Sequence, residues 1–356
     1  MKLAIECKPY PDETLTSWII RNSAANGTDP KSFALSVFFT HSTWYKDIDR
    51  YIDYKQLIQL LRVTSLSKQD IRNLTLEDLI VRNTPKELAR PLKWGFVVPV
   101  GIKGSIRTGG LYFCPNCLKE NNPYIRKQWK LAWFISCPKH KILLHVQCTK
   151  CNQAFSPHLI RYDFPYIRFC TNCGYDLTSI PATTVSKEAL SFQNILSDIA
   201  FNGKSTDKFP LVSFSSVELF LTLEKMLSFL KYAYAHKKYD TLFKELKVYK
   251  KHIFEKGNNK TFSRLNIKDR EYLIIIVNRL LKLEVNEIIT LFQNIELSRR
   301  TFLKTFVHVS ETIELIASNI NAKVVPKPPR KVFKKIEPKS KEEVDLLFKE
   351  IEVYLK

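Results

Sequence analysis

The sequence predicts a mainly α-helical protein that also contains small β modules built around bound metal ions. Apolar residues recur at helical spacing in the N-terminal part of the chain and again in its C-terminal half. Between these parts, seven of the eight cysteines fall within one stretch that also carries short strand and turn patterns. We therefore expect an N-terminal helical domain with helix-turn-helix character, two tandem zinc-finger modules resembling zinc ribbons, and a helical C-terminal domain.

The composition is that of a globular protein that binds polyanions. The 356 residues are 45% hydrophobic and 12% aromatic, which excludes collagen-like and disordered classes. A formal net charge of +21 favours nucleic acid or an anionic surface as partner. No stretch approaches the roughly eighteen apolar residues of a membrane span, and no signal-peptide pattern is present. We expect a soluble, cytoplasmic protein without a membrane partner.

Two helix pairs are expected in the N-terminal domain. Residues 12–27 carry apolar side chains at helical spacing and end at an Asn-Gly turn, after which Asp29 can cap a helix that Pro30 opens. A third helix is expected over 54–64, and Ser67 can cap a short fourth one. Such pairs are more often packing units than DNA readers, so the helix-turn-helix pattern alone does not assign a function.

The patterns then change three times along the chain. Strand and turn signals begin near Trp94, long helical patterns return after Pro181, and four prolines with many cations interrupt helix before a last amphipathic helix over about 340–355. The expected divisions are residues 1–93 for the N-terminal domain, 94–180 for the zinc modules, 181–321 for the helical C-terminal domain, and 322–356 for a basic arm and terminal helix.

Four C-x-x-C or C-x-x-H knuckles point to metal ligation. A two-residue spacer lets one turn place two ligands on the same side of a Zn²⁺ ion. Pairing consecutive knuckles gives two closed shells of four protein ligands, which indicates two structural Zn²⁺ ions; pairing the first knuckle with the third and the second with the fourth stays an alternative. The ligands are Cys114, Cys117, Cys137 and His140, followed by Cys148, Cys151, Cys170 and Cys173.

Other residues near these knuckles have less specific signals. His145 and His158 lie off the ligand spacing, and we expect them at the surface or beside the ligands. Trp129 and Trp133 are expected to pack beneath a zinc site, with base stacking as the alternative. Cys7 is expected to be an ordinary reduced thiol.

The sequence offers no catalytic residues with a defensible arrangement. Asp47 and Asp49 have the spacing of a nuclease metal pair, but aspartates at this spacing more often cap helices or face solvent. A phosphate-binding loop of the G-x-x-x-x-G-K-[ST] type is absent from the sequence. We therefore expect a protein that is not an enzyme.

Two basic segments are candidates for nucleic-acid contact. Residues 231–260 interleave lysines with tyrosines, and residues 284–307 can form two short helices, the second capped by Ser298. A solvated lysine face, or a protein-binding or structural role, remains the alternative. The candidate contact residues are Lys237, Lys238, Lys247, Lys250, Lys251, Arg299, Arg300 and Lys304.

Three stretches resemble a known family. The run Lys8 to Arg21, KPYPDETLTSWIIR, with the following Asn-Gly, resembles the opening signature of TniQ-domain proteins. The segment from Trp44 to Arg50 resembles a second, less regular element. The block from Phe113 to Leu144, with its Cys-Pro-x-His knuckle, resembles the strongest feature of the family. The resemblance covers about residues 1–178, and the C-terminal half carries no motif that can be transferred.

The TniQ/TnsD family selects targets for transposons. The resemblance implies a non-catalytic adaptor that bridges a target-recognising complex on DNA, of the guide-RNA Cascade type, to the AAA+ regulator TnsC. A TnsD-like selector that reads DNA sequence directly is the first alternative, and a zinc-dependent nucleic-acid-binding protein unrelated to transposition is the second. The implied partners are TnsC, a Cascade-type effector or target DNA, and a second copy in a homodimer. Leu15, Trp18 and Arg21 would face a partner, unless Leu15 and Trp18 are simply core.

Overall fold

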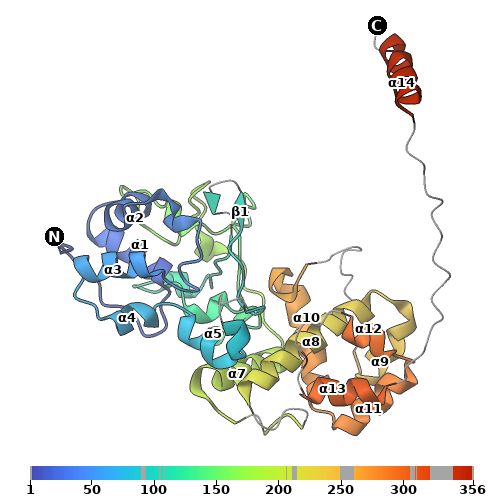
Figure 1. The fold of residues 1–356 in the computed structure, drawn as a ribbon. Helices are drawn as coiled ribbons and strands as arrows, with labels where there is room; N and C mark the ends of the chain where they lie inside the picture. Colours follow the sequence, from blue (N-terminus) through green and yellow to red (C-terminus); the bar gives the residue numbers. More distant parts are fainter. Residues whose placement is uncertain are drawn as a thin grey trace. The chain divides into compact units, whose positions relative to one another are not determined.

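The computed structural model describes residues 2–89, 94–103, 106–107, 109–205, 207–210, 215–248, 260–304, 309, 311–320 and 340–354. The chain divides into two compact units, residues 1–321 and 322–356. The first unit is mainly helical with two short hairpins, so the predicted fold class is confirmed (Figure 1). Two of the candidate cations, Lys250 and Lys251, and the expected basic arm over 322–339 lie outside the described residues.

The N-terminal helices begin at the residues that their capping chemistry predicts. The Thr14 hydroxyl accepts the N–H of Ser17, Asp29 caps the second helix, and Ser67 forms a capping box at the fourth. Thr14 is therefore the cap of the first helix. The elements are α1 (Leu15–Ala25), α2 (Pro30–Phe38), the 3-10 helix η1 (His41–Trp44), α3 (Tyr54–Val63), α4 (Lys68–Asn73), α5 (Glu77–Asn83) and α6 (Lys86–Ala89).

The middle of the chain consists of turns with little regular structure. Two antiparallel hairpins pair β1 (Ile102–Lys103) with β2 (Ile106–Arg107), and β3 (Ser136–Cys137) with β4 (Ile142–Leu143). Single bridges, such as Phe113 with His145, hold neighbouring loops together. The short 3-10 helices are η2 (Cys117–Lys119), η3 (Lys127–Lys130), η4 (Pro157–Leu159) and η5 (Leu177–Ser179).

Helices form the described part of the chain after residue 186. The long helices α8 and α10 lie side by side, and α5 from the N-terminal part packs on α8 (Figure 1). The elements are α7 (Lys187–Asn202), α8 (Ser216–Tyr234), η6 (Lys237–Tyr239), α9 (Asp240–Glu245), η7 (Phe262–Arg264), α10 (Ile267–Leu281), α11 (Val285–Asn294), α12 (Arg299–Leu303) and α13 (Glu311–Asn319). In the second unit, α14 (Lys341–Tyr354) is the terminal helix that the sequence predicts.

An aromatic cluster joins the middle region to α8. The rings of Trp94, Phe96 and Trp133 surround Phe220 of α8, with centroid distances of 5.0 Å from Phe220 to both tryptophans. Trp129 and Trp133 are both buried, so neither ring can stack on a base in this fold. Trp133 instead stabilises the packing of the middle region on the helical half.

Two buried polar side chains also cross this junction. The Gln193 carboxamide of α7 accepts the N–H groups of Ile135 and Ser136, at 2.8 and 3.0 Å, and donates to the Ser136 carbonyl at 3.0 Å. The Arg270 guanidinium of α10 donates to the carbonyl of Ala132 at 3.1 Å and lies over the Tyr112 ring. Buried backbone groups need such partners, so the middle region depends on the helical half.

Candidate functional site

The first ligand quartet comes together in the sequential pairing of knuckles. The Nδ1 atom of His140 lies 3.4 Å from the Sγ atoms of Cys114 and Cys117 and 3.5 Å from that of Cys137. The Cys117 and Cys137 sulfurs are 3.6 Å apart. A tetrahedron with zinc–sulfur bonds of about 2.3 Å has edges of about 3.8 Å, and a nitrogen ligand shortens them slightly. The spacing therefore fits one tetrahedral ion.

The second quartet has the same dimensions and four sulfur donors. Cys148 and Cys173 place their Sγ atoms 3.8 Å apart, and Cys151 and Cys170 place theirs 3.6 Å apart. In both quartets all donor atoms lie within 4.8 Å of one another. The described residues thus contain two Cys/His groups that can hold a metal ion, each with four protein ligands and a donor set that suits Zn²⁺.

Local backbone turns bring the two ligands of a knuckle together. In three knuckles the residue after the second ligand has a left-handed backbone, and its N–H donates to the carbonyl of the first cysteine. These residues are Lys141, Asn152 and Gly174, with donor–acceptor distances of 2.7, 2.9 and 2.9 Å. Glycine and asparagine adopt this conformation readily, so the sequence favours the turn in the second module.

The chemistry of the first quartet also favours a bound cation. Hydrogen bonds with Cys114 and Cys137, together with burial, raise the pKa of the Cys117 thiol above its ordinary value. A Zn²⁺ ion binds thiolates and so offsets their mutual repulsion. On the outer side, the Nε2 atom of His140 faces a carboxylate oxygen of Glu120 at 3.8 Å, which is longer than a hydrogen bond.

The signature of α1 forms a buried polar network. The Glu13 carboxylate is fully buried, pairs with the Arg21 guanidinium at 2.6 Å and accepts the Ser17 hydroxyl at 2.8 Å. The Ser17 oxygen in turn accepts the N–H of Ile125 at 3.0 Å. Arg21 also lies 4.1 Å from the centroid of the Tyr10 ring. The network therefore connects the segment directly before α1, α1 itself and the loop after the first knuckle.

These contacts bear on the two interpretations that the sequence left open for Leu15 and Trp18. Leu15 and Trp18 are both fully buried, and the Trp18 indole donates to the Cys7 carbonyl at 2.8 Å. They belong to the core, so in this fold neither can contact a partner directly. Arg21 is partly exposed, but its guanidinium is already paired with Glu13.

The two aspartates of the suggested nuclease pair have separate structural roles. Asp49 is buried and accepts the N–H of Thr16, in the first turn of α1, at 2.7 Å. Asp47 pairs with the buried Lys130 ammonium at 2.9 Å. Both aspartates therefore make structural contacts and do not form a pair of metal ligands.

The off-spacing histidines differ from each other. His158 is buried and stacks on Trp44 at 5.4 Å between centroids, so the expectation that it lies at the surface is wrong. Its ring fills a gap between η4 and η1. His145 is half-buried against Phe113, and burial lowers its pKa below the ordinary value.

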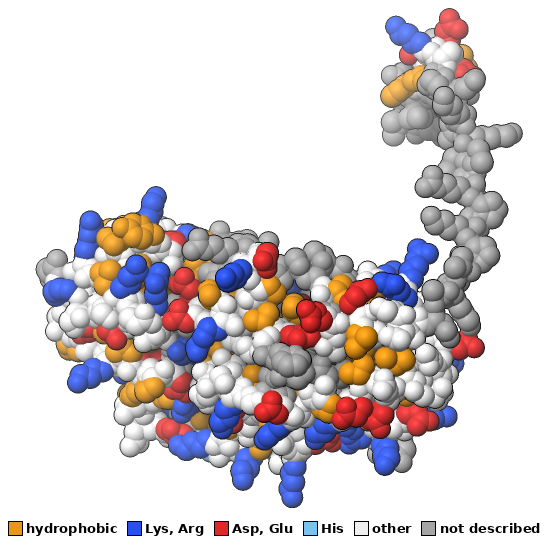
Figure 2. Space-filling model, turned by 60° about the horizontal axis from the view of Figure 1, so that its bottom comes forward, with side chains coloured by type: hydrophobic (Ala, Val, Ile, Leu, Met, Phe, Trp, Pro, Cys, Tyr) orange, Lys and Arg blue, Asp and Glu red, His pale blue; other side chains and the backbone are white. Residues whose placement is uncertain are grey.

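The candidate cations within the described residues are mostly exposed. Lys237, Lys238 and Lys247 lie at the surface around η6 and after α9, with the Lys238 ammonium 4.5 Å from the centroid of the buried Tyr239 ring. On the face that Figure 2 shows, Lys and Arg side chains alternate with Asp and Glu. Charges of both signs are therefore interspersed on this face.

The second basic segment forms the helix pair that the sequence predicts. Ser298 caps α12 by accepting the N–H of Thr301 at 3.2 Å, and Phe302 is buried below. Arg299 pairs with Glu314 of α13 at 2.6 Å, whereas Arg300 and Lys304 are exposed. Arg300 and Lys304 are therefore better placed than Arg299 to contact a phosphate.

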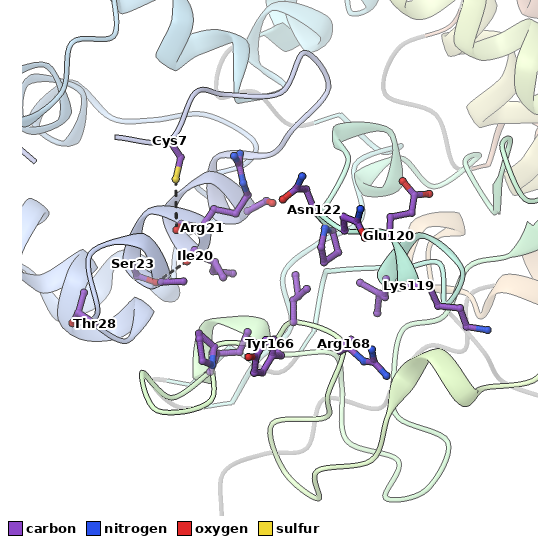
Figure 3. A pocket seen from close by; sticks show the side chains of 18 residues that line it. Cys7, Ile20, Arg21, Ser23, Thr28, Lys119, Glu120, Asn122, Tyr166 and Arg168 are labelled. Carbon is purple, nitrogen blue, oxygen red and sulfur yellow. Dashed lines mark hydrogen bonds between the residues drawn. The ribbon is translucent and has the colours of Figure 1, made fainter. Parts of the chain in front are cut away.

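Sequence reasoning missed a surface feature beside the second quartet. Three aromatic side chains of the run from Arg161 to Phe169 are exposed, and the run lines a cavity that α1 also lines (Figure 3). The dense aromatic and arginine content of this run was the available signal.

No helix among the described residues is long and apolar enough to cross a membrane.

Comparison with protein-family models matches residues 4–144 to the family described as TniQ. No curated protein matches the chain. The match begins in the lead-in to α1 and ends just after the first quartet. The second quartet and the helices from α7 onward lie outside it.

Proposed function

Because residues 4–144 make this chain a member of the TniQ family, we propose that it is a non-catalytic adaptor that selects targets for a transposon. A TniQ domain supports a transposition-associated role in target selection in general. The finer proposal is that the chain bridges a target-recognising complex of the guide-RNA Cascade type to the AAA+ regulator TnsC. The TniQ match, whose range includes the Glu13–Arg21 network and the first quartet, is the observation on which this depends.

The two quartets support an adaptor more than an enzyme. Each has four protein ligands, a set that holds Zn²⁺ in structural sites and leaves no position for a reacting water. When bound, Zn²⁺ would cross-link loops that otherwise have little regular structure. The aspartates nearest to a nuclease pattern, Asp47 and Asp49, hold Lys130 and the start of α1. These observations favour a binding role.

The distribution of charge supports contact with a nucleic-acid backbone inside an assembly. Exposed cations lie on two separate elements of the helical half, around η6 and on α12. Phosphate contacts of this kind position a protein without reading sequence. A guide-RNA complex on DNA would offer such phosphates.

Direct DNA reading is the second candidate function. The observation that favours it is the pair α11 and α12, in which the capped second helix exposes Arg300 in its first turn and Lys304 directly after its last residue. A recognition helix in the major groove would place such side chains against base edges or phosphates. In that case the chain would choose its target without guide RNA.

A reconstituted transposition reaction tests the proposal. The zinc-loaded chain, TnsC, the transposase and a Cascade-type complex with its guide RNA are combined with donor and target DNA, and insertions are mapped by sequencing. We expect insertions beside the guide-matched site only when the chain is present. The chain should also retain TnsC and guide RNA together in a co-purification.

Two controls sharpen this experiment. Cys117→Ser should abolish targeted insertion because it opens the first quartet. Charge reversal at Arg300 separates the two candidates, because a changed preference among duplex targets without guide RNA would support direct reading. Targeted insertion that proceeds equally without the chain would contradict both.

A further inference from the structure

An exposed aromatic loop projects from the second metal module. We define it as residues 160–169, between the second and third ligands of that quartet. Tyr162, Phe164 and Tyr166 are 66%, 48% and 56% exposed. The Phe164 ring centroid lies 5.2 Å from that of Tyr166 and 4.9 Å from that of Phe169, so these side chains form one group. Exposed aromatic groups of this kind mark interaction sites.

The backbone of the aromatic loop is held in a defined shape. Its turns are closed by Phe164 N–H donating to Arg161, Tyr166 N–H donating to Phe164, and Phe169 N–H donating to Tyr166, at 2.9–3.2 Å. Ile167 is buried beneath, and Cys170 follows directly as a ligand. The exposed rings are therefore presented from a rigid base, which lowers the entropic cost of binding a partner.

A cavity of about 530 Å³ opens beside this loop (Figure 3). Three segments line it: α1 with its lead-in, the loop from Leu118 to Pro123 after the first knuckle, and the aromatic loop itself. Its lining mixes polar residues with the buried apolar side chains of Ile20, Ile160 and Ile167. The volume falls within the range of about 300–1,000 Å³ that is usual for binding pockets.

The charges around the cavity favour a protein over a nucleic acid. Each arginine at or beside it has a carboxylate partner: Arg21 pairs with Glu13, Arg161 with Asp163, and Arg168 with Asp176. Paired guanidiniums are poor phosphate ligands, because a phosphate must displace the carboxylate. Stacking on single-stranded nucleic acid normally combines aromatic rings with unpaired cations along the backbone path.

Lys119, at the rim of the cavity, differs from these paired arginines. Lys119 is exposed and lines the cavity, and the described residues include no acidic partner for its ammonium group. The neighbouring Glu120 is engaged with Lys139 at 2.8 Å. The cavity thus combines buried isoleucine side chains, the exposed ring of Tyr166 and the available positive charge of Lys119.

We propose that the aromatic loop and this cavity form a docking surface for a protein segment that inserts an apolar side chain and sets a carboxylate against Lys119. The surface joins residues of the TniQ match to a loop outside it. The inference deepens the proposed function and rests on it in one respect, since an adaptor needs a surface for a protein partner. Tyr166 and Lys119 are its central contacts.

A phage-displayed peptide library, panned against the immobilised full chain loaded with zinc, provides the probe. We expect enriched peptides with an aromatic or aliphatic anchor next to Asp or Glu. The dissociation constant of the best peptide, measured by fluorescence anisotropy, should rise about thirty-fold in Tyr166→Ala, as for a typical hot-spot residue. Lys119→Glu should weaken the acidic peptide and favour one in which the acid is replaced by Lys.

A matched control is Tyr54→Ala, which removes an exposed tyrosine from α3 and should leave the affinity unchanged. Unchanged zinc content and melting temperature show that Tyr166→Ala is folded. Failure to enrich peptides, or equal binding by Tyr166→Ala, would overturn the proposal. So would binding of a fluorescent single-stranded oligonucleotide that depends on Tyr166, or conversion of a dimer to a monomer by Tyr166→Ala.

The two proposals fail in distinguishable ways. If targeted insertion needs no chain but peptide binding depends on Tyr166, the transposition role is wrong and the docking surface stands. If insertion needs the chain but Tyr166→Ala and Lys119→Glu bind every enriched peptide normally, the docking surface is wrong and the transposition role stands.

Discussion

Replacing Arg21 with alanine would leave the buried carboxylate of Glu13 without its cation. Removing one partner of a buried ion pair costs about 3–5 kcal/mol of unfolding free energy. Arg21 is 22% exposed at its side chain, so water can replace part of the guanidinium's effect, and we expect about 2–3 kcal/mol. The contact with the Tyr10 ring accounts for about 0.5–1 kcal/mol of this.

The cost of this substitution should depend on pH. Burial raises the pKa of Glu13 above its ordinary value, while Arg21 and Ser17 lower it. Without Arg21 the pKa rises further, so the folded variant binds a proton more strongly than the unfolded chain does. A group whose pKa is raised on folding stabilises the folded state most at pH values below its pKa in the unfolded chain. This stabilisation is lost as the pH rises through the pKa of the group in the folded state. The cost should therefore be larger at about pH 8 than at about pH 5.5.

Urea denaturation followed by tryptophan fluorescence, with zinc present, measures this cost. Arg72→Ala is the matched control, because Arg72 and Glu77 form an exposed pair at 3.9 Å that contributes less than about 1 kcal/mol. Adding Glu13→Gln to Arg21→Ala should recover part of the stability and remove the pH dependence. A loss below about 1 kcal/mol at both pH values, equal to that of the control, would refute the reasoning.

Three further predictions concern the metal sites, the basic surface and the core. Elemental analysis should find two zinc ions per folded chain, and fewer than two in the unaltered chain would contradict the assignment. Cys117→Ser or Cys173→Ser should reduce the zinc content to about one ion per chain and unfold the affected module. Arg300→Glu should flatten the salt dependence of nucleic-acid binding by roughly one unit of slope, and an unchanged slope would remove this residue from the interface. Lys130→Met should cost about 2–3 kcal/mol because it removes the buried cation 2.9 Å from the largely buried Asp47 carboxylate, which then keeps the more distant Arg50 at 3.7 Å. Lys46→Met, at an exposed pair, should cost under about 1 kcal/mol, and equal losses would contradict this.

The parts of this fold that follow from the sequence depend on short-range chemistry. Helix starts at Asp29, Ser67 and Ser298 could be predicted because a side chain and the N–H groups that it caps are two or three residues apart. The knuckles could be predicted for the same reason, since their ligands are three residues apart.

The features that sequence reasoning missed depend on contacts between distant segments. Arg270 meets the carbonyl of Ala132 across 138 residues, and no local pattern indicates such a pairing. Lys130 is buried although lysine is among the residues least often buried, and its place depends on Asp47. The aromatic loop was missed because exposure depends on which surfaces the rest of the fold leaves uncovered.

The Gln193 carboxamide has a consequence for exchanging the segment that matches the TniQ family between proteins. Its oxygen and nitrogen offer the same acceptor and donor as a peptide group, and through them α7 takes the place of a neighbouring strand beside β3. A chimera joined between residue 144, where the family match ends, and α7 would replace α7. It would lose the hydrogen bonds from Gln193 to β3 unless the incoming segment also carries an amide side chain at this position. Interchangeable pieces of this protein should therefore be divided after α7, so that each recombinant retains its own amide.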